Sequence, residues 1–146
     1  MIRKSFIFVN AFVLMFIFLS VKAFAIDVNI DGKYIEFDTQ QPILENGRTL
    51  VPMRKIFEEL GCEVEWLNKT QTIVATKNSK LIVLQINNQM MFVEDIESKQ
   101  YQTIELEVSP KLLNNRTLMP IRAISEVLDY TVSWDEENKT VAIKNK

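Results

Sequence analysis

Residues 48–54, RTLVPMR, decide the fold, because they recur 68 positions later as RTLMPIR at residues 116–122. The same offset lays residues 36–77 on residues 104–145 without a gap, and fourteen of those 42 pairs are identical. Self-similarity at one fixed offset is typical of a repeated structural unit. The sequence therefore predicts two units of one fold, residues 26–79 and residues 80–146.

Short strands joined by turns make up most of each predicted unit. In the first unit, residues 27–30 and 34–37 flank the hairpin turn signal Asp31-Gly32, and residues 62–66 and 72–76 form a second hairpin. Strands with short connections pair antiparallel, and one helix packed on such a sheet gives an α+β fold. The second unit is expected to have strands at residues 81–86, 90–93, 130–134 and 140–144, and a flexible loop at the polar residues 97–102.

One short helix is predicted in each unit. In the first, an apolar face at helical spacing is formed by Met53, Ile56, Phe57 and Leu60. Pro52 is expected to be the first helical residue, because it lacks an N–H that would be unpaired there. Gly61 is expected to end the helix in the left-handed conformation. The second helix repeats the face with Ile121, Ile124 and Leu128, but Asp129 replaces the glycine, which predicts a less relaxed helix end.

The first 25 residues have the layout of a secretory signal peptide. Arg3 and Lys4 give a short positive region, residues 6–19 are almost entirely apolar, and Ala23-Phe24-Ala25 offers small residues to a signal peptidase. The alternative is an uncleaved membrane anchor flanked by Lys22, although the apolar run is shorter than the ~20 residues that span a bilayer. Cleavage would leave 14 Lys and Arg against 19 Asp and Glu, a net charge of −5. Such an acidic chain is not expected to bind nucleic acid.

The composition excludes several kinds of catalytic site. The chain has no histidine, which removes Ser-His-Asp and Cys-His arrangements and the imidazole ligands of copper and catalytic zinc. Its three glycines form no phosphate-binding loop. Cys62 is the only cysteine, and we expect a buried apolar side chain, the alternative being a free thiol for intermolecular pairing. We therefore predict no catalytic residue, cofactor or metal site.

A longer motif surrounds the repeated stretch. It runs from Asn46-Gly47 through residues 48–54 to Glu58, Leu60-Gly61, Val64 and Trp66, and it recurs between Asn114 and Trp134. Both copies resemble the copper amine oxidase N-terminal domain, also called the stalk domain, and two tandem copies would cover nearly all of the chain after the signal peptide. The departures are Asn115 in place of the motif's glycine and Asp129-Tyr130 in place of its usual small pair.

The resemblance implies a fold and a setting. Each copy would be a five-stranded antiparallel sheet curled around one helix. The family occurs in exported proteins of Gram-positive bacteria, alone or beside cell-wall enzymes. Amine oxidation is not implied, because the family is named for an accessory domain that lies away from the copper site.

Charged and aromatic residues at equivalent positions of the two units are the candidates for a ligand site or a structural motif. They are Arg48, Arg54, Glu58, Trp66, Arg116, Arg122, Glu126 and Trp134. Arg54 and Glu58, four residues apart on a helix, are expected to form an ion pair worth only about 0.3–0.5 kcal/mol when exposed. The same applies to Arg122 and Glu126. Because such pairs are weak, we also expect these arginines to bond the carbonyl of a neighbouring strand.

The other four candidates lie outside the helices. Arg48 and Arg116 are expected to hold the turns before them, and the alternative is that they bind an anionic wall polymer. Trp66 and Trp134 are expected to pack in or at the edge of the core, because tryptophan dominates burial in small cores. The alternative is a platform on which sugars stack.

Three functional hypotheses follow. The first is a secreted or cell-wall-associated, non-catalytic module that binds a cell-wall polymer or an envelope protein through a sheet face or edge, with two units adding avidity. The second is a small cell-wall hydrolase that acts on glycan or peptidoglycan and requires two carboxylates in a concave site. The third is a ligand-free structural spacer, whose surface would lack an apolar patch or concavity. A membrane is an expected partner only if the signal peptide stays uncleaved.

Overall fold

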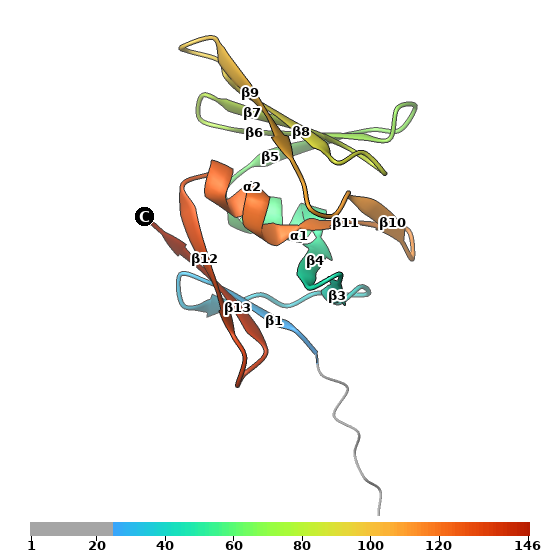
Figure 1. Cartoon of the computed structure of the whole chain (residues 1–146), viewed down its shortest axis with the longest axis vertical. Helices are drawn as coiled ribbons and strands as arrows, with labels where there is room; N and C mark the ends of the chain where they lie inside the picture. The colour runs from blue at the N-terminus through green and yellow to red at the C-terminus, as the bar shows by residue number, and fades with distance from the viewer. Residues whose placement is uncertain (1–24) are drawn as a thin grey trace, which may run out of the picture.

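The computed structural model describes residues 25–146 (Figure 1). The predicted signal peptide, residues 1–25, lies outside this range except for Ala25. The described chain folds into thirteen strands and two helices, and its three sheets are antiparallel but for one pair of strands. The expected α+β class is therefore confirmed.

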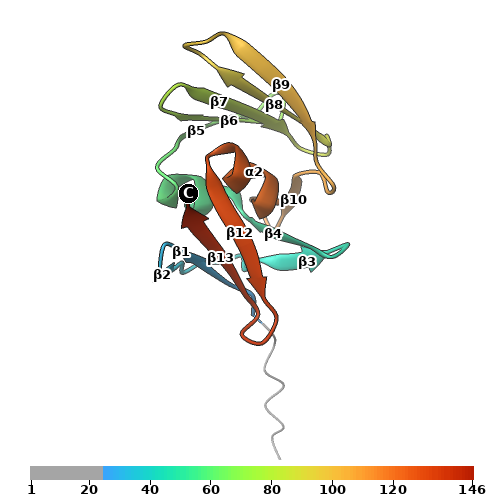
Figure 2. The same cartoon turned by 60° about the vertical axis from the view of Figure 1, so that its left-hand side comes forward.

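Sheet C forms one end of the molecule (Figures 1 and 2). Its strands follow the chain in the order β5-β6-β7-β8-β9, and every neighbouring pair is antiparallel. Their bounds are β5 Glu63–Leu67, β6 Thr72–Lys77, β7 Lys80–Gln85, β8 Met90–Asp95 and β9 Gln100–Glu105.

Sheet B joins the two hairpins that contain the repeated stretch. Its order is β10-β11-β4-β3, so the hairpins meet along β4 and β11, where Val51 lies opposite Met119. These two residues occupy the same position of the motif, so the pairing of β4 with β11 is symmetric about that point. The bounds are β3 Ile43–Glu45, β4 Arg48–Pro52, β10 Lys111–Leu113 and β11 Arg116–Pro120.

Sheet A brings together the beginning and the end of the described chain. Its order is β12-β13-β1-β2, and β1 runs parallel to β13, with Asp27 opposite Thr140. In sheet C, β6 of the first predicted unit likewise pairs with β7 of the second. The two units thus share all three sheets, unlike the separate five-stranded sheets that the resemblance implied. The bounds are β1 Asp27–Ile30, β2 Lys33–Tyr34, β12 Tyr130–Asp135 and β13 Thr140–Asn145.

Helices α1 (Met53–Glu59) and α2 (Ile121–Val127) lie between sheets A and C (Figures 1 and 2). The expectation that Pro52 is the first helical residue is wrong by one position. With ψ at 115° it is still extended and ends β4, and the helix begins at Met53. Neither helix within residues 25–146 is long and apolar enough to cross a membrane.

The ends of the two helices agree with the prediction. Gly61 has a φ of +78° and Asp129 a φ of +67°, so the aspartate adopts the left-handed conformation without the freedom of glycine. Asn115, which replaces the motif's glycine in the β10–β11 turn, likewise has a positive φ of 59°. Both departures from the motif therefore preserve the turn geometry.

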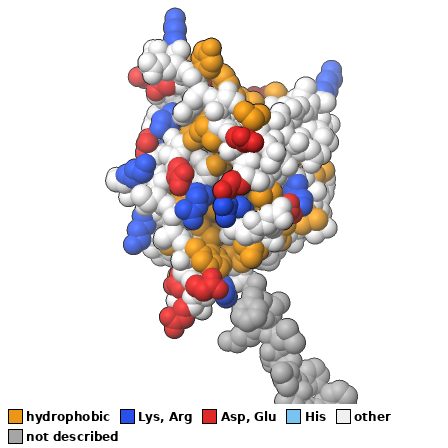
Figure 3. All heavy atoms as spheres, in the orientation of Figure 1, with side chains coloured by type: hydrophobic (Ala, Val, Ile, Leu, Met, Phe, Trp, Pro, Cys, Tyr) orange, Lys and Arg blue, Asp and Glu red, His pale blue; other side chains and the backbone are white. Residues whose placement is uncertain are grey.

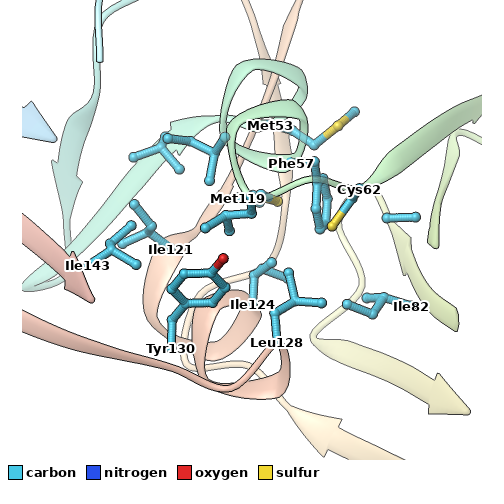
Figure 4. Packing of buried hydrophobic residues seen from close by; sticks show 14 of the residues in the cluster. Met53, Phe57, Cys62, Ile82, Met119, Ile121, Ile124, Leu128, Tyr130 and Ile143 are labelled. Atoms are coloured by element: carbon cyan, nitrogen blue, oxygen red, sulfur yellow. The ribbon is translucent and has the colours of Figure 1, made fainter. Parts of the chain in front are cut away.

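One hydrophobic core includes residues from both predicted units (Figure 4). Phe57 of α1 and Ile124 of α2 are fully buried, as are Ile82 of sheet C and Ile143 of sheet A. Cys62 lies beside Phe57 and is also buried, which confirms its expected place (Figure 4). Burial raises the pKa of the Cys62 thiol to about 11.

Residues 97–102 do not form the loop that their polarity suggested. Only residues 97–99 are a turn, held by Asp95 Oδ1, which accepts hydrogen bonds from the backbone amides of Glu97 and Ser98 at 3.1 and 2.9 Å. The rest belongs to β9, which pairs with β8 from Glu105 opposite Met90 to Gln100 opposite Asp95. Backbone pairing does not require apolar side chains on an edge strand, and hydrophobic patterning cannot detect such a strand.

Candidate functional site

Two surface grooves contain all eight candidate residues. Groove 1 has a volume of about 520 Å³ and is lined by Glu36, Phe37, Asp38, Thr39, Gln40, Pro52, Met53, Arg54, Lys55, Glu58, Trp66, Asn68, Gln71, Leu112, Asn115, Arg116 and Thr117. Groove 2 has a volume of about 1610 Å³, and α2 and parts of all three sheets line it. Its charged and aromatic lining residues are Arg48, Glu105, Glu107, Arg122, Glu126, Trp134, Glu136 and Lys139.

The two grooves are built from equivalent positions. Every residue that lines groove 1, except Gln40, has a counterpart in groove 2 at an offset of 68 residues. For the groove 1 residues on α1 and β5, the counterpart lies 68 residues later in the chain. For those on the β10–β11 hairpin, it lies 68 residues earlier. The two grooves are therefore equivalent sites, and the positions that one unit contributes to groove 1 are contributed by the other unit to groove 2.

Neither groove is complete within one predicted unit. Groove 1 takes Arg54, Glu58 and Trp66 from the first unit and Arg116 from the second. Groove 2 takes Arg122, Glu126 and Trp134 from the second unit and Arg48 from the first. The exchange follows from the meeting of the hairpins along β4 and β11. The repeat identified the eight residues, but nothing in the sequence showed how they would be divided between two sites.

The expected ion pairs between Arg54 and Glu58 and between Arg122 and Glu126 are absent from residues 25–146. On α1 the ion pair is instead Lys55 with Glu59, at 3.0 Å, and Glu59 also accepts from Lys33 at 2.7 Å. Glu59 is the last residue of α1, where the side chain of Lys33 of β2 can also reach it. These contacts lower the pKa of Glu59, with the Lys33 hydrogen bond as the largest cause.

The side chains of Arg54 and Arg122 also form none of the hydrogen bonds within residues 25–146, so the expected bond to a strand carbonyl is wrong. Both arginines and both glutamates are exposed to solvent in the grooves. They are therefore free to contact a ligand.

Arg48 and Arg116 hold their turns as expected. Arg48 donates to the carbonyl of Gly47 at 3.2 Å, and Arg116 donates to the carbonyl of Asn115 at 3.4 Å. Arg48 also forms an ion pair with Glu107. At the position equivalent to Glu107, groove 1 has Thr39, so among the described residues Arg116 has no acidic partner.

The two tryptophans differ in exposure. Trp66 is half-buried and packs against the core, as expected. The expectation is wrong for Trp134, which is 37% exposed and does not pack against the core. Its Nε1 donates to Glu136. Hydrogen bonds from Lys139 and then Trp134 hold the pKa of the Glu136 carboxyl below its usual value. Trp134 therefore offers a ring face at the surface of groove 2.

The helices give the two grooves different walls. At matching positions, α1 has Lys55 and Glu59 where α2 has Ala123 and Val127, and both α2 residues line groove 2. Figure 3 shows the face that contains α2, on which hydrophobic side chains gather beside acidic and basic ones. Groove 2 is thus the larger and more apolar of the two.

Carboxylates are present in both grooves, as the hydrolase hypothesis requires. Groove 1 contains Glu36, Asp38 and Glu58, and all are exposed, as are the four glutamates of groove 2. A general acid at neutral pH needs apolar surroundings that keep its carboxyl protonated, and solvent does not provide them. Two of the groove 2 carboxylates, Glu107 and Glu136, are also engaged by basic partners. Within residues 25–146, no group of acidic or cysteine side chains could hold a metal ion.

The sequence has two similarities to known proteins. The sequence model of the copper amine oxidase N-terminal domain matches residues 29–143 once, in a single span that includes both predicted units. That domain is a non-catalytic stalk domain. The chain is also 29% identical over 118 residues to a protein named "Protease inhibitor" from Brevibacillus choshinensis. The match covers 80% of this chain but 33% of the relative, so the chain spans about a third of that protein.

Proposed function

Because the chain belongs to the copper amine oxidase N-terminal domain family, we propose that it is an exported, non-catalytic binding module of the cell envelope. Residues 1–25 are its signal peptide, and residues 26–79 and 80–146 are two copies of one stalk-like unit. The grooves support this division, because they use matching positions of both units. The shared sheets indicate that the two copies form one binding body.

The observation that carries the proposal is that the two grooves are lined by equivalent positions of the two units. At matching positions, each has two arginines, one glutamate and one tryptophan, and in each the second arginine comes from the opposite unit. Arginine binds carboxylates and phosphates, and tryptophan stacks on flat or apolar groups. A cell-wall polymer or an envelope protein presents such groups. Two sites on one body would bind a repeating partner with avidity. The grooves also argue against a spacer, whose surface would have no concavity.

Retention of the purified protein on isolated cell wall and on envelope proteins tests the proposal. We expect retention on at least one fraction, a loss of about tenfold in each of the double variants Arg54→Ala/Arg116→Ala and Arg48→Ala/Arg122→Ala, and a near-complete loss when both are combined. Lys144→Ala, at an exposed position of β13 that lines neither groove, is the control. Failure of the unaltered protein to bind either fraction would reject the proposal.

Protease inhibition is a second candidate, favoured by the name of the Brevibacillus choshinensis relative. A panel of serine, cysteine and metalloproteases, each assayed with and without the protein, tests it directly. Inhibition that survives both double arginine variants would place the inhibitory surface outside the grooves. Absence of inhibition across the panel would remove this candidate.

A further inference from the structure

Groove 2 lies where one free edge of each of the three sheets comes to the surface. The edge strands are β12 of sheet A, β3 of sheet B and β9 of sheet C, and residues from all three line the groove. An edge strand presents unpaired backbone N–H and C=O groups, which another polypeptide can pair with. We propose that groove 2 binds an extended, apolar segment of another protein, which adds as a strand to the free edge of β9. This inference rests on the proposed binding function and names its partner class.

The free edge of β9 has a defined hydrogen-bonding pattern. Leu106 N donates to Gln89 O at 2.7 Å, and the register of β8 and β9 places these two residues opposite each other. Backbone groups alternate in direction along an antiparallel strand. The N–H and C=O groups of Tyr101, Thr103 and Glu105 therefore point away from β8, toward the side where no strand pairs within residues 25–146.

The β9 edge lacks the protection that exposed edges usually have. Natural edge strands are blunted by charges, proline or short length. β9 is six residues long, and its first five residues contain neither a charge nor a proline. By contrast, β5, the other edge of sheet C, contains Glu63 and Glu65.

The walls of groove 2 suit apolar side chains. Ala123 and Val127 take the places of the charged Lys55 and Glu59 of α1, and Ile104 and Leu44 add apolar surface. Two basic residues of the groove already have acidic partners, since Arg48 pairs with Glu107 and Lys139 with Glu136. An anionic polymer would have to compete with these carboxylates. An apolar segment would not.

The size of groove 2 also favours a chain over a small molecule. Its volume of about 1610 Å³ exceeds the roughly 300–1,000 Å³ of small-molecule sites. A strand added to an edge obtains affinity from backbone hydrogen bonds and specificity from alternate side chains. A glycan has no backbone with this alternation of donors and acceptors.

The test begins with a library of random peptides of about ten residues, the length of a long strand, selected on the whole protein. The best peptide is then compared with a twin whose alternate backbone amides are N-methylated. We expect apolar residues at every second position, binding at least about tenfold weaker for the N-methylated twin, and slower hydrogen exchange at Tyr101, Thr103 and Glu105 in the complex. No enriched peptide, or protection confined to other strands, would overturn the proposal.

Two sets of variants locate the binding edge. Thr103→Pro removes an outward N–H without breaking a bond to β8, and an edge position tolerates proline; Thr103→Val retains the N–H as its control. Ala123→Lys/Val127→Glu gives α2 the charged residues that α1 has at the same positions, and Lys55→Ala/Glu59→Val on α1 is the reverse control. We expect Thr103→Pro and the groove 2 variant to weaken peptide binding at least about tenfold, with both controls unchanged. Equal loss in a control would contradict the assignment.

Retention on envelope proteins, measured for the unaltered protein and for Thr103→Pro, separates the two proposals. Retention that falls in Thr103→Pro supports both. Equal retention of the two leaves the binding function standing and rejects the strand-addition site. If the unaltered protein is not retained but still binds the selected peptide through β9, the envelope function fails and the site stands.

Discussion

Asp129 shows how a single residue compensates for a departure from the repeated motif. A non-glycine residue in the left-handed region costs about 1–2 kcal/mol, and Asp129 replaces the relaxed Gly61 there. Lys80 offsets part of that cost, because its Nζ donates to Asp129 Oδ2 at 2.5 Å and to the carbonyl of Val127 at 2.7 Å. The second bond satisfies a carbonyl in the last turn of α2, which helices otherwise leave unpaired.

Ser125 of α2 is buried, and its hydroxyl has no hydrogen-bond partner within residues 25–146. The equivalent residue of α1 is Phe57, which fills the core with apolar atoms. We predict that Ser125→Ala raises the free energy of unfolding by about 1 kcal/mol, because it removes an unsatisfied buried polar atom. Urea unfolding of both proteins measures the difference, with the exposed Ser133→Ala as control. A destabilised Ser125→Ala would show that the hydroxyl has a partner, such as an internal water.

Cys62 is predicted to be inert in the folded protein. The reactive form is the thiolate, and burial raises the pKa of this thiol from its ordinary 9.0 to about 11. At pH 8 we expect a maleimide to react about 100-fold more slowly with the folded protein than with protein unfolded in urea. Fast labelling of the folded protein would instead support the alternative of an accessible thiol for intermolecular pairing.

At the scale of elements, two hairpin turns are held by the same pattern of hydrogen bonds to an aspartate. Asp95 is the last residue of β8 and Asp135 the last of β12. Each carboxylate accepts hydrogen bonds from the amides two and three residues later. These bonds favour the ionised carboxylate and lower both pKa values; the largest cause is the Ser98 amide for Asp95 and the Asn138 side chain for Asp135.

The turns predict how stability depends on pH. A carboxyl whose pKa is lower in the folded than in the unfolded state stabilises the fold above its unfolded pKa, and this contribution is lost as pH falls through the folded pKa. We expect the free energy of unfolding to fall as the pH is lowered from about 5 to 3. The fall should be smaller in Asp95→Asn/Asp135→Asn than in the unaltered protein. Asp27→Asn, on the exposed side of β1, is the control, and an unchanged slope in the double variant would contradict the prediction.

Elements with a strong local signal were predictable from the sequence, and the others were not. The apolar faces located both helices, and Pro52 gave the start of α1 to within one residue. Gly61 marked the end of α1. These signals could be read because helical spacing and a left-handed stop are local features. β9 was missed because its exposed polar residues have no apolar alternation, and β2 is shorter than the predicted 34–37. The candidate residues were found through the repeat, but the ion pair of Arg48 was not, since its partner Glu107 lies 59 residues away along the chain.

At the scale of the whole molecule, the arrangement depends on contacts that no local pattern encodes. The pairings of β4 with β11 and of β1 with β13 link residues that are far apart in the sequence and belong to different predicted units. These contacts divide the eight candidates between two grooves and merge the two predicted units into one body. The sequence could indicate the units and their motif, but not the exchange between them.

The shared sheets predict that neither predicted unit folds alone. Residues 26–79 would lose the strands that pair with β1, β4 and β6 from the other unit, and residues 80–146 would lose those that pair with β13, β11 and β7. We expect each fragment, produced separately, to lack a cooperative unfolding transition in circular dichroism. An equimolar mixture is expected to recover strand signal through the missing pairs. A cooperative transition in either fragment alone would show that a single unit is self-sufficient.

The parallel pairing of β1 with β13 has a consequence for the order of folding. Asp27 finds its partner, Thr140, only after nearly the whole described chain is available. β1 can pair with β2 early in synthesis, but its other edge has no partner until the last hairpin emerges. Contacts this distant in sequence raise the relative contact order, which slows folding. We therefore expect the pairing of β1 with β13 to form late in folding.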